Sequence, residues 1–525
     1  MPSLKKLPVG IQAFETIREG EFIYVDKTQH AFRLIDEGMF YFLSRPRRFG
    51  KSLLVSTLKC IFQGRKELFD DLWISKNTNW EWQPHPVIMI DFNQIPHNTP
   101  ENLVKGIEID LKRTAGENNI TLKTQFIETQ LQELITGLYK KTKTKVVILI
   151  DEYDKAIIDH LGKGDEFMKI AQANRDILKR YFGVLKGGEV SPMLRFMFIT
   201  GVSKFSRVSL FSELNNLEDI SMNRFYAQML GYTEDELKTV FENHITRFSK
   251  ETGLSVDKIE SKLKRHYDGY RFSQDNATVY NPFSILSSLK CRNFKNFWFE
   301  TGTPTFLVNL LKQNNYHIPE IEKMTVDEQV FSTYELEDLK PEAILFQTGY
   351  VTIKNVAGEI YCLDYPNREV KISFLKHLIF SYTKEISAQQ SSKFLLLAQY
   401  LDNENFDDFF NTIISIFASI PYSIESKRDE AYFHTLFYLM VSASGLETQA
   451  EIITCRGRID LAVKFADKVF IMEFKCNQNA DIGLAQIREK GYAEPFMETN
   501  RKIIIMGINF STEKRNVAEW KYENL

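Results

Sequence analysis

Closely spaced cysteines are missing from this sequence. There is no CxxC pair and no spacing typical of a zinc knuckle, and the total of five is odd. A disulfide framework is therefore excluded, and we expect reduced thiols in a reducing compartment. The cysteines are Cys60, Cys291, Cys362, Cys455 and Cys476.

Long apolar runs are also missing. No stretch approaches the ~20 residues of a membrane-spanning helix, and the first residues, MPSLKKLPVGIQAF, contain no apolar segment typical of a signal peptide. We therefore expect a cytoplasmic protein with no membrane partner.

A strong net charge is absent as well. The formal net charge is −3, so the chain as a whole lacks the basic field typical of nucleic-acid-binding proteins. This weakens a nucleic-acid function without excluding it, because a single domain can still carry a local basic patch.

The chain is long and has ordinary globular composition. Its 525 residues exceed one hydrophobic core, and at roughly 150 residues per domain it should form about three or four structural units. Hydrophobic residues make up 43% and charged residues 26%, so a folded globular protein is expected throughout. No internal repeat and no low-complexity linker marks the boundaries.

The first part of the chain alternates between apolar strands and helical patterns. Continuous apolar strands separated by helices indicate a parallel sheet covered by helices on both faces. The sequence therefore predicts an α/β domain over residues 1–231. The expected strands are 41–44, 87–92, 145–154 and 194–201, and the expected helices include 51–62 and two within 101–142.

The predicted secondary structure changes twice in the rest of the chain. The pattern predicts a helical lid at 232–289 and a mostly helical connector at 290–414. Within the connector, 344–354 and 359–366 resemble the hairpin of a winged-helix module. Residues 415–525 show a helix, three antiparallel strands, a helix and a strand, which predicts a second α/β domain.

A candidate phosphate site lies in the segment YFLSRPRRFGKSLLVSTL. Gly50, Lys51 and Ser52 stand between an expected strand and an expected helix. Backbone N–H groups at the helix start would bind phosphate, Lys51 would reach the β- and γ-phosphates, and Ser52 would ligate magnesium. The GxxxxGK[ST] pattern is incomplete, because Arg45 stands at the position of the first glycine. On this segment alone, a helix cap with a surface lysine is an equally good interpretation.

A second acidic motif supports the nucleotide interpretation. Asp151 ends the apolar strand VVILID, and Glu152 follows it. Asp151 fits the role of holding magnesium through its water shell, and Glu152 that of polarising the attacking water. Both would lie in the crevice at the carboxyl ends of parallel strands. A solvated acidic turn is the alternative, but the two motifs occur in the expected order on the expected elements, so we predict ATP and Mg²⁺ as cofactors. The candidate residues are Arg47, Arg48, Phe49, Gly50, Lys51, Ser52, Asp151 and the catalytic Glu152.

A third motif lies near the C-terminus. GRID ends with Asp460, and VFIMEFKC supplies Glu473 and Lys475. Period-two alternation puts Glu473 and Lys475 on one strand face with Phe474 opposite, and Asp460 can face them from the neighbouring strand. Two close carboxylates make an oxygen site for one or two magnesium ions, which activate water for attack on phosphate. Lys475 can orient that water or stabilise the pentacovalent state. An exposed cross-strand charge pair is the alternative.

The chain as a whole resembles the AAA-ATPase-like family that is fused to PD-(D/E)xK nucleases in bacteria. The resemblance covers nearly the whole chain, and this family tolerates an arginine-rich phosphate loop. The segments that carry the resemblance are YVDKT (24–28), RPRRFGKSLL (45–54), ILIDEYD (148–154), FITGVSKFS (198–206) and YNPFSIL (280–286).

The resemblance implies further roles in the nucleotide site. Thr200 occupies the sensor position that would read the γ-phosphate, with a plain strand-ending threonine as the alternative. Asp26 and Lys27 would border the nucleotide without an assigned role. Arg224 is a candidate arginine finger, although a surface arginine is the better interpretation.

The C-terminal motif resembles the PD-(D/E)xK superfamily, with Ile459 in place of the proline. This implies a restriction-endonuclease-like fold in which Glu430 is a further metal ligand beside Asp460 and Glu473. Gln486 and Tyr492 match the Q…Y pattern of the nucleases fused to these ATPases. Some members of the superfamily bind without cutting, so activity stays open. The candidate catalytic residues are Asp460, Glu473, Lys475 and Gln486.

These features favour ATP-regulated cleavage of nucleic acid, with DNA as the favoured partner. The proteins with which this family occurs suggest a role in defence against foreign DNA or in mobile-element biology. Because AAA-like domains often form rings, a homo-oligomer is a further candidate. Two alternatives stay open. One is a signalling or scaffold ATPase with a non-catalytic C-terminal binding module, which suits the near-neutral charge. The other is a protein that binds ATP but barely hydrolyses it, which the arginine-rich loop suggests.

Overall fold

The chain folds into two compact units in a computed structural model. The first contains Met1–Thr301 and Val326–Cys362, and the second contains Gly302–Thr325 and Leu363–Leu525. Residues 205–206 of the FITGVSKFS segment and 426–428 of the last domain's first helix lie outside the described residues. The structure describes residues 4–204, 216–298, 305–313, 316–331, 336, 339–383, 388–420, 429–499 and 501–525.

The first unit is built on a five-stranded parallel sheet with strand order β2-β3-β4-β1-β5. The apolar runs predicted as strands all form strands of this sheet, and β3 is buried along its whole length. The strands are β1 (Phe40–Ser44), β2 (Val87–Asp91), β3 (Val146–Asp151), β4 (Leu194–Gly201) and β5 (Glu218–Asp219).

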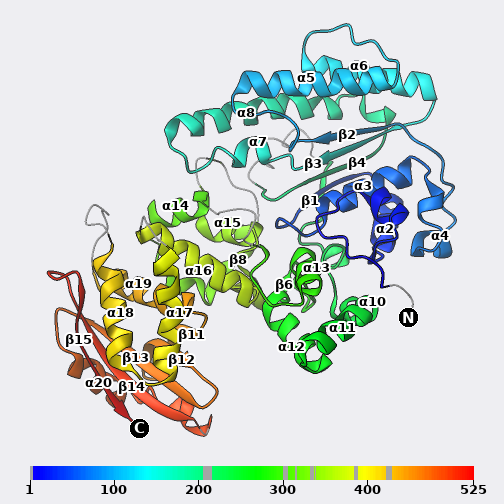
Figure 1. Ribbon diagram of the computed structural model, residues 1–525. Coiled ribbons are helices and arrows are strands. Elements are labelled where there is room, and N and C mark those ends of the chain that lie inside the picture. Colours follow the sequence, from blue (N-terminus) through cyan, green and yellow to red (C-terminus); the bar gives the residue numbers. More distant parts are fainter. Residues whose placement is uncertain are drawn as a thin grey trace. The chain divides into compact units, whose positions relative to one another are not determined.

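Helices cover both sides of this sheet. Figure 1 shows α5, α6 and α8 gathered on one side, with α2 and α3 on the other. This arrangement explains why the strands are continuously apolar, and it confirms the predicted α/β fold. The helices are α1 (Phe14–Glu19), α2 (Thr28–Glu37), α3 (Lys51–Phe62), α4 (Trp73–Asn77), α5 (Pro100–Glu117), α6 (Ile127–Thr142), α7 (Lys155–Ile158) and α8 (Asp165–Gly183).

The predicted lid is helical. A capping box formed by Thr233 and Glu236 starts α10, and apolar residues of α10 to α13 share one core with Ile23 and Val25 near the N-terminus. The elements are α10 (Glu234–Val240), α11 (Glu242–Thr252), α12 (Val256–Tyr267), β6 (Tyr270–Arg271), β7 (Thr278–Val279) and α13 (Pro282–Cys291).

One predicted hairpin starts later than expected. Residues 344–347 belong to helix α15 rather than to a strand, because Pro341 sits at the start of that helix and fixes a helical backbone angle there. The strands that follow are neighbours in a small sheet of order β8-β10-β9. The elements are β8 (Met324–Asp327), α15 (Pro341–Gln347), β9 (Thr352–Ala357) and β10 (Ile360–Asp364).

The second unit contains a five-stranded mixed sheet with strand order β11-β12-β13-β14-β15. Only β13 and β14 pair in parallel; the other neighbours are antiparallel. The last strand, β15, was not predicted. The elements are α14 (Thr305–Gln313), α16 (Arg368–Thr383), α17 (Ala388–Asp402), α18 (Phe406–Ala418), α19 (Glu430–Ala443), β11 (Glu447–Thr454), β12 (Gly457–Lys464), β13 (Lys468–Cys476), α20 (Ala480–Glu489), β14 (Lys502–Ser511) and β15 (Asn516–Asn524).

Two apolar layers sandwich this sheet. On one face, Ile471 and Ile505 pack in one core with Leu484 and Ile487 of α20. On the other face, Phe474 packs against the rings of α19 and of β14. The alternation along β13 therefore gives opposite faces to Ile471 and Phe474. Among the described residues, no helix is long and apolar enough to cross a membrane.

Candidate nucleotide and nuclease sites

The phosphate loop runs from β1 into α3 in a backbone form suited to anions. Gly50 caps α3 with φ +93°, and Arg48 also has a positive φ of +70°. A Cβ added at Gly50 would meet no atom of the described residues within 4 Å. The requirement for glycine is therefore conformational, and the first N–H groups of α3 are left free to bind an anion.

Lys51 is the centre of this loop. Its side chain is 3% exposed, and its Nζ donates to the carbonyl oxygens of Arg45 at 3.2 Å and Pro46 at 3.3 Å. It also pairs with Glu152 Oε1 at 3.3 Å. The structure thus brings Lys51 and Glu152 together, as predicted for one phosphate site, and the loop's own oxygens hold the ammonium group.

Arg45, at the position of the missing first glycine, anchors the phosphate loop to its own unit instead of facing a phosphate. Arg45 is 1% exposed, and its guanidinium donates to the carbonyl oxygens of Ser44 at 2.9 Å and Ser221 at 2.7 Å. It also lies 4.1 Å from the ring of Phe272. Burial lowers the pKa of Arg45 to about 9. Arg45 therefore fixes the loop to the segment after β5.

Asp151 and Ser52 meet at the end of β3. Burial raises the pKa of Asp151 to about 6, against the opposing hydrogen bond from Ser52. Asp151 Oδ1 is buried with no hydrogen-bond partner among the described residues. Glu152 follows with φ +51°, an unusual conformation for a glutamate, which turns it toward Lys51.

The end of β4 lies between these two motifs, since β4 separates β1 from β3 in the sheet. The hydroxyl of Thr200 is fully buried and donates to Leu43 O at 2.9 Å, so its hydrogen is used within the sheet. No role for Asp154 was predicted from the sequence. Its carboxylate accepts from the backbone of Val202 at 3.1 Å and Ser203 at 2.7 Å, which ties the loops after β3 and β4 together.

The other loop residues support or flank the site. Phe49 is buried against Tyr270, with ring centroids 4.7 Å apart. Arg48 stacks over Phe283 at 4.2 Å. Arg47 is exposed, and its carbonyl oxygen accepts from Trp298 at 3.1 Å.

Three residues named through the resemblance have clear positions. Asp26 accepts from the backbone of Trp73 at 2.6 Å and so acts within the N-terminal packing. Lys27 lines a pocket that reaches Gly50. Arg224 is 68% exposed and pairs with Asp275 at 3.4 Å, as a surface arginine does.

An apolar pocket adjoins the phosphate loop. Its volume is about 70 Å³, which is below the usual range for small-molecule sites. The N-terminal segment, the start of α3 and the entry to the lid all contribute to it. Its lining includes Tyr24, Val25, Lys27, Phe49, Gly50, Leu53, Leu54, Met229, Leu230, Gly231 and Tyr232.

In the second unit, Asp460 sits where two strands separate. The register between β12 and β13 is regular from Lys464–Val469 to the pair Leu461–Met472. Beyond that pair, the N–H of Phe474 donates to Asp460 Oδ2 at 2.8 Å. Burial raises the pKa of Asp460 to about 6. A carboxylate thus replaces a backbone acceptor and faces the neighbouring strand.

Glu473 and Lys475 lie on one face of β13, as period-two alternation predicts. Lys475 Nζ is 3.1 Å from Glu473 Oε1, and Gln486 Nε2 donates to the same oxygen. Glu473 Oε2 is buried and has no hydrogen-bond partner among the described residues. Burial and the charge of Asp460 raise the pKa of Glu473 to about 8, although Lys475 acts in the opposite direction.

Two glycines let α20 approach this cluster. A Cβ on Gly507, which is paired with Glu473, would lie 2.0 Å from Ala480 O. A Cβ on Gly483 would lie 3.0 Å from the Cα of Gly507. The close contact of α20 with β14 brings Gln486 within reach of Glu473.

The remaining predicted nuclease residues lie around this cluster. Glu430 is exposed at the first position of α19, and its charge contributes to the raised pKa of Asp460. Tyr492 OH accepts from the backbone of Arg458 at 3.1 Å and lies 3.5 Å from Gln486 Nε2. The structure thus brings Asp460, Glu473, Lys475, Gln486 and Tyr492 together around adjacent strand ends, with Glu430 at the edge.

Both sites fit a magnesium ion by their donor chemistry. Each has a buried carboxylate oxygen with no hydrogen-bond partner in the part of the chain that the structure describes, Asp151 Oδ1 in one and Glu473 Oε2 in the other. Magnesium prefers oxygen ligands of this kind, and a cation would balance the charge that burial makes costly.

The fold and these sites define a P-loop domain joined to a nuclease-fold domain. Comparison with known proteins agrees. A family described as "Predicted AAA-ATPase" matches residues 8–211, and the "PD-(D/E)XK nuclease superfamily" matches residues 428–520. A relative from Azotobacter chroococcum mcd 1, "Uncharacterized protein in vnfD 5'region", is 37% identical over the full length of both chains. The chain belongs to the family of AAA-ATPase-like proteins with a C-terminal PD-(D/E)XK nuclease superfamily domain.

Proposed function

We propose that this protein binds and hydrolyses ATP and cleaves DNA with magnesium, and that its nucleotide state controls cleavage. The observation that carries the nuclease part is the pairing of the half-buried Asp460 with the buried Glu473. The raised pKa values of both carboxyl groups and the unpartnered Glu473 Oε2 show that placing these groups here costs folding free energy. A cluster with that cost is typical of a functional site rather than a structural one. Lys475 and Gln486 complete the cluster.

In the nuclease site, Asp460, Glu473 and the nearby Glu430 would hold Mg²⁺. The ion would lower the pKa of a bound water and neutralise charge on the scissile phosphate. Lys475 is fixed between Glu473 Oε1 and the carbonyl oxygen of Phe474, at 2.8 Å from the latter. From there it can orient the attacking water or stabilise the developing negative charge. Gln486 and Lys475 together hold the glutamate in one orientation.

In the nucleotide site, the N–H groups at the start of α3 bind the phosphates, and Lys51 exchanges its contacts with loop carbonyls for phosphate oxygens. Ser52 and Asp151 would hold Mg²⁺, which would neutralise charge on the phosphates. Glu152 orients the attacking water once Lys51 has left it. Thr200 would sense the γ-phosphate by giving up its contact with Leu43.

The first experiment measures cleavage. Plasmid and single-stranded DNA are incubated with the full chain in magnesium or manganese, with and without ATP. Glu473→Gln removes one carboxylate with little change in volume and should reduce cleavage by at least about 100-fold. Glu489→Gln, an exposed glutamate on α20, is the matched control and should cut like the wild type. Equal cleavage by the Glu473→Gln variant would reject the proposed nuclease site.

The second experiment tests the control by ATP. Lys51→Ala removes the phosphate-binding ammonium group and should abolish the effect of ATP on the cleavage rate. Lys59→Ala, on the same helix, is the control. Cleavage that is indifferent both to ATP and to loss of Lys51 would reject the coupling while leaving the nuclease intact. Nucleotide binding without cleavage of any substrate would favour the scaffold ATPase with a non-catalytic C-terminal module.

A further inference from the structure

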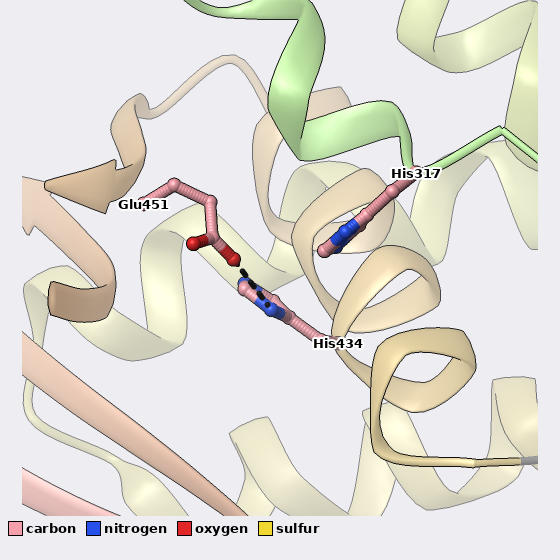
Figure 2. A group of neighbouring side chains, drawn as sticks. All are labelled: His317, His434 and Glu451. Atoms are coloured by element: carbon pink, nitrogen blue, oxygen red, sulfur yellow. Dashed lines mark ion pairs between the residues drawn. The ribbon is translucent and has the colours of Figure 1, made fainter.

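A second cluster of metal-binding side chains lies in the second unit, outside the carboxylate site. His317 precedes a short 3₁₀ helix (Ile318–Ile321), His434 lies on α19, and Glu451 lies on β11. One potential ligand atom from each lies within 4.8 Å of the other two. Figure 2 shows the two imidazole rings and the carboxylate converging from three separate segments. The side chains of His434 and Glu451 are only 6% and 8% exposed.

The hydrogen bonds of His434 leave one nitrogen facing another acceptor. Its Nε2 is 3.0 Å from the carbonyl oxygen of Asp460, which can only accept, so Nε2 carries the hydrogen. Burial lowers the pKa of His434 to about 3, so the ring is neutral near pH 7. Its Nδ1 then has a free lone pair, directed at Glu451 Oε1 at 3.3 Å. Two acceptors at this distance require a proton or a cation between them.

The third potential metal ligand, His317, also has a ring nitrogen without a hydrogen-bond partner among the described residues. This nitrogen, Nε2, is buried. Burial lowers the pKa of His317, which favours the neutral ring that a metal needs. The rings of His317 and His434 meet edge to face, with centroids 5.5 Å apart.

The far side of each buried ligand is already held. A histidine that binds a metal through one nitrogen usually donates its other N–H to a carbonyl or carboxylate, as His434 does to Asp460. Glu451 Oε2 pairs with Nε of Arg458, which leaves Oε1 for a ligand. The side chain of Arg458 is 57% exposed, so it can turn toward solvent when a cation enters.

We infer that His317, His434 and Glu451 bind one divalent transition-metal ion of the zinc class. Two imidazole nitrogens and one carboxylate oxygen form a ligand set that binds zinc in preference to magnesium. Ligands about 2.0–2.1 Å from a tetrahedral ion lie about 3.3 Å apart, which is the distance between His434 Nδ1 and Glu451 Oε1. His317, the least buried of the three, needs a side-chain rotation to close the set. A solvent molecule takes the fourth position.

This ion acts on the nuclease site through one hydrogen bond. It fixes the ring of His434, and His434 holds the carbonyl group of Asp460, whose carboxylate belongs to the proposed magnesium site. His434, His317 and Glu451 are thus positioning residues for Asp460. The metal site itself does not depend on the proposed nuclease activity, because its ligands are different side chains.

The test measures zinc itself. The full-length protein is stripped with a chelator, dialysed against ~10 µM zinc chloride with millimolar magnesium, and analysed for bound zinc and for thermal unfolding. The wild type should retain one zinc per chain and unfold at a higher temperature with zinc. His317→Ala should weaken zinc binding by about 100-fold and lose the thermal shift, and Glu451→Gln should behave in the same way. His266→Ala, in the other unit, is the control.

Glu473→Gln separates the two metal sites. It should keep its zinc, whereas zinc lost in Glu473→Gln but kept in His317→Ala would place the ion at the nuclease carboxylates and overturn the inference. No bound zinc in the wild type would also overturn it, and would leave a proton shared between His434 and Glu451. Loss of magnesium-dependent cleavage in Glu473→Gln bears on the proposed function alone. Cleavage should also fall in His317→Ala, and cleavage at the wild-type rate by that variant would show that the bound zinc does not position Asp460.

Discussion

At the scale of residues, Glu473 lies in a strand interior where 2% of its surface is exposed. Burial raises its pKa from the ordinary value of 4.5 to about 8. Between these values the folded chain keeps a proton that the unfolded chain has released. Without metal, the free energy of unfolding therefore falls as the pH rises from about 5 to 8. Below pH 4.5 both states are protonated, and this contribution no longer changes.

The first prediction follows from this titration. Glu473→Gln cannot ionise, so at pH 8 the free energy of unfolding of the metal-free variant should exceed that of the wild type by roughly 1–4 kcal/mol. The variant should therefore unfold at a higher temperature. The difference should shrink toward pH 5. Thermal unfolding in the presence of a chelator, from pH 5 to pH 9, measures it. Glu489→Gln should follow the wild type at every pH, and a wild type that is more stable than Glu473→Gln at pH 8 would contradict the argument.

A second prediction concerns Glu152, whose backbone has φ +51° and whose side chain reaches Lys51. Glu152→Gln keeps the shape but loses the charge that polarises water. ATP hydrolysis should fall by at least about 100-fold, while ATP affinity changes little, because the phosphate-binding groups remain. Phosphate release and nucleotide binding are measured together, with Glu166→Gln on α8 as the exposed control. Hydrolysis at the wild-type rate would show that another group activates the water.

Some of these residues could be found from the sequence and others could not. Glu473, Lys475 and Asp460 follow from the period of a strand and from the residue types, because the contacts are between close neighbours. The role of Arg45 could not be found, because its acceptors at Ser221 and Tyr226 are fixed only by the tertiary fold. Asp154 was visible in ILIDEYD, but its partners lie on the loop after another strand.

At the scale of elements, continuous apolar runs predicted the parallel strands because both faces of that sheet are covered. The edge strand β15 was missed, since NVAEWKYEN is largely polar and only partly buried. An edge strand with one neighbour has little apolar signal. The helix α15 was mistaken for a strand because four apolar residues stand together in PEAILFQ, and the proline at its start was the signal that would have corrected this.

The third prediction concerns the contact between α20 and β14. Gly507→Ala places a Cβ 2.0 Å from Ala480 O, so the helix has to move away and Gln486 loses Glu473. Stability should fall by about 1–3 kcal/mol, and DNA cleavage should fall with it. The control is Gly116→Ala in α5, where a Cβ meets nothing within 4 Å. There, stability should rise by up to about 1 kcal/mol. Denaturant unfolding of both variants checks the contrast, which fails if Gly507→Ala is as stable as the wild type.

At the scale of the whole molecule, the chain crosses between its two units three times. The residues 326–362 return to the first unit after 302–325 have contributed to the second. The sequence indicated a single connector at 290–414, because local composition does not reveal which unit a segment packs against. The returning segment supports the nucleotide site: Gly349 packs so closely on Pro46 of the phosphate loop that a Cβ there would lie 2.7 Å from it.

The last prediction tests that support. A fragment of residues 1–301 lacks the returning segment and therefore loses several hydrogen bonds to it. Lys204 loses Gln347 at 2.7 Å and Phe331 at 3.1 Å, and Arg271 loses Thr352 at 2.8 Å. Each lost hydrogen bond of this kind contributes about 0.5–1.5 kcal/mol to stability. The fragment 1–362 keeps these partners. It should therefore unfold at a higher temperature and bind ATP more tightly than 1–301, as measured by thermal unfolding and nucleotide titration. Equal stability and equal ATP affinity of the two fragments would mean that residues 326–362 do not help to hold the phosphate loop.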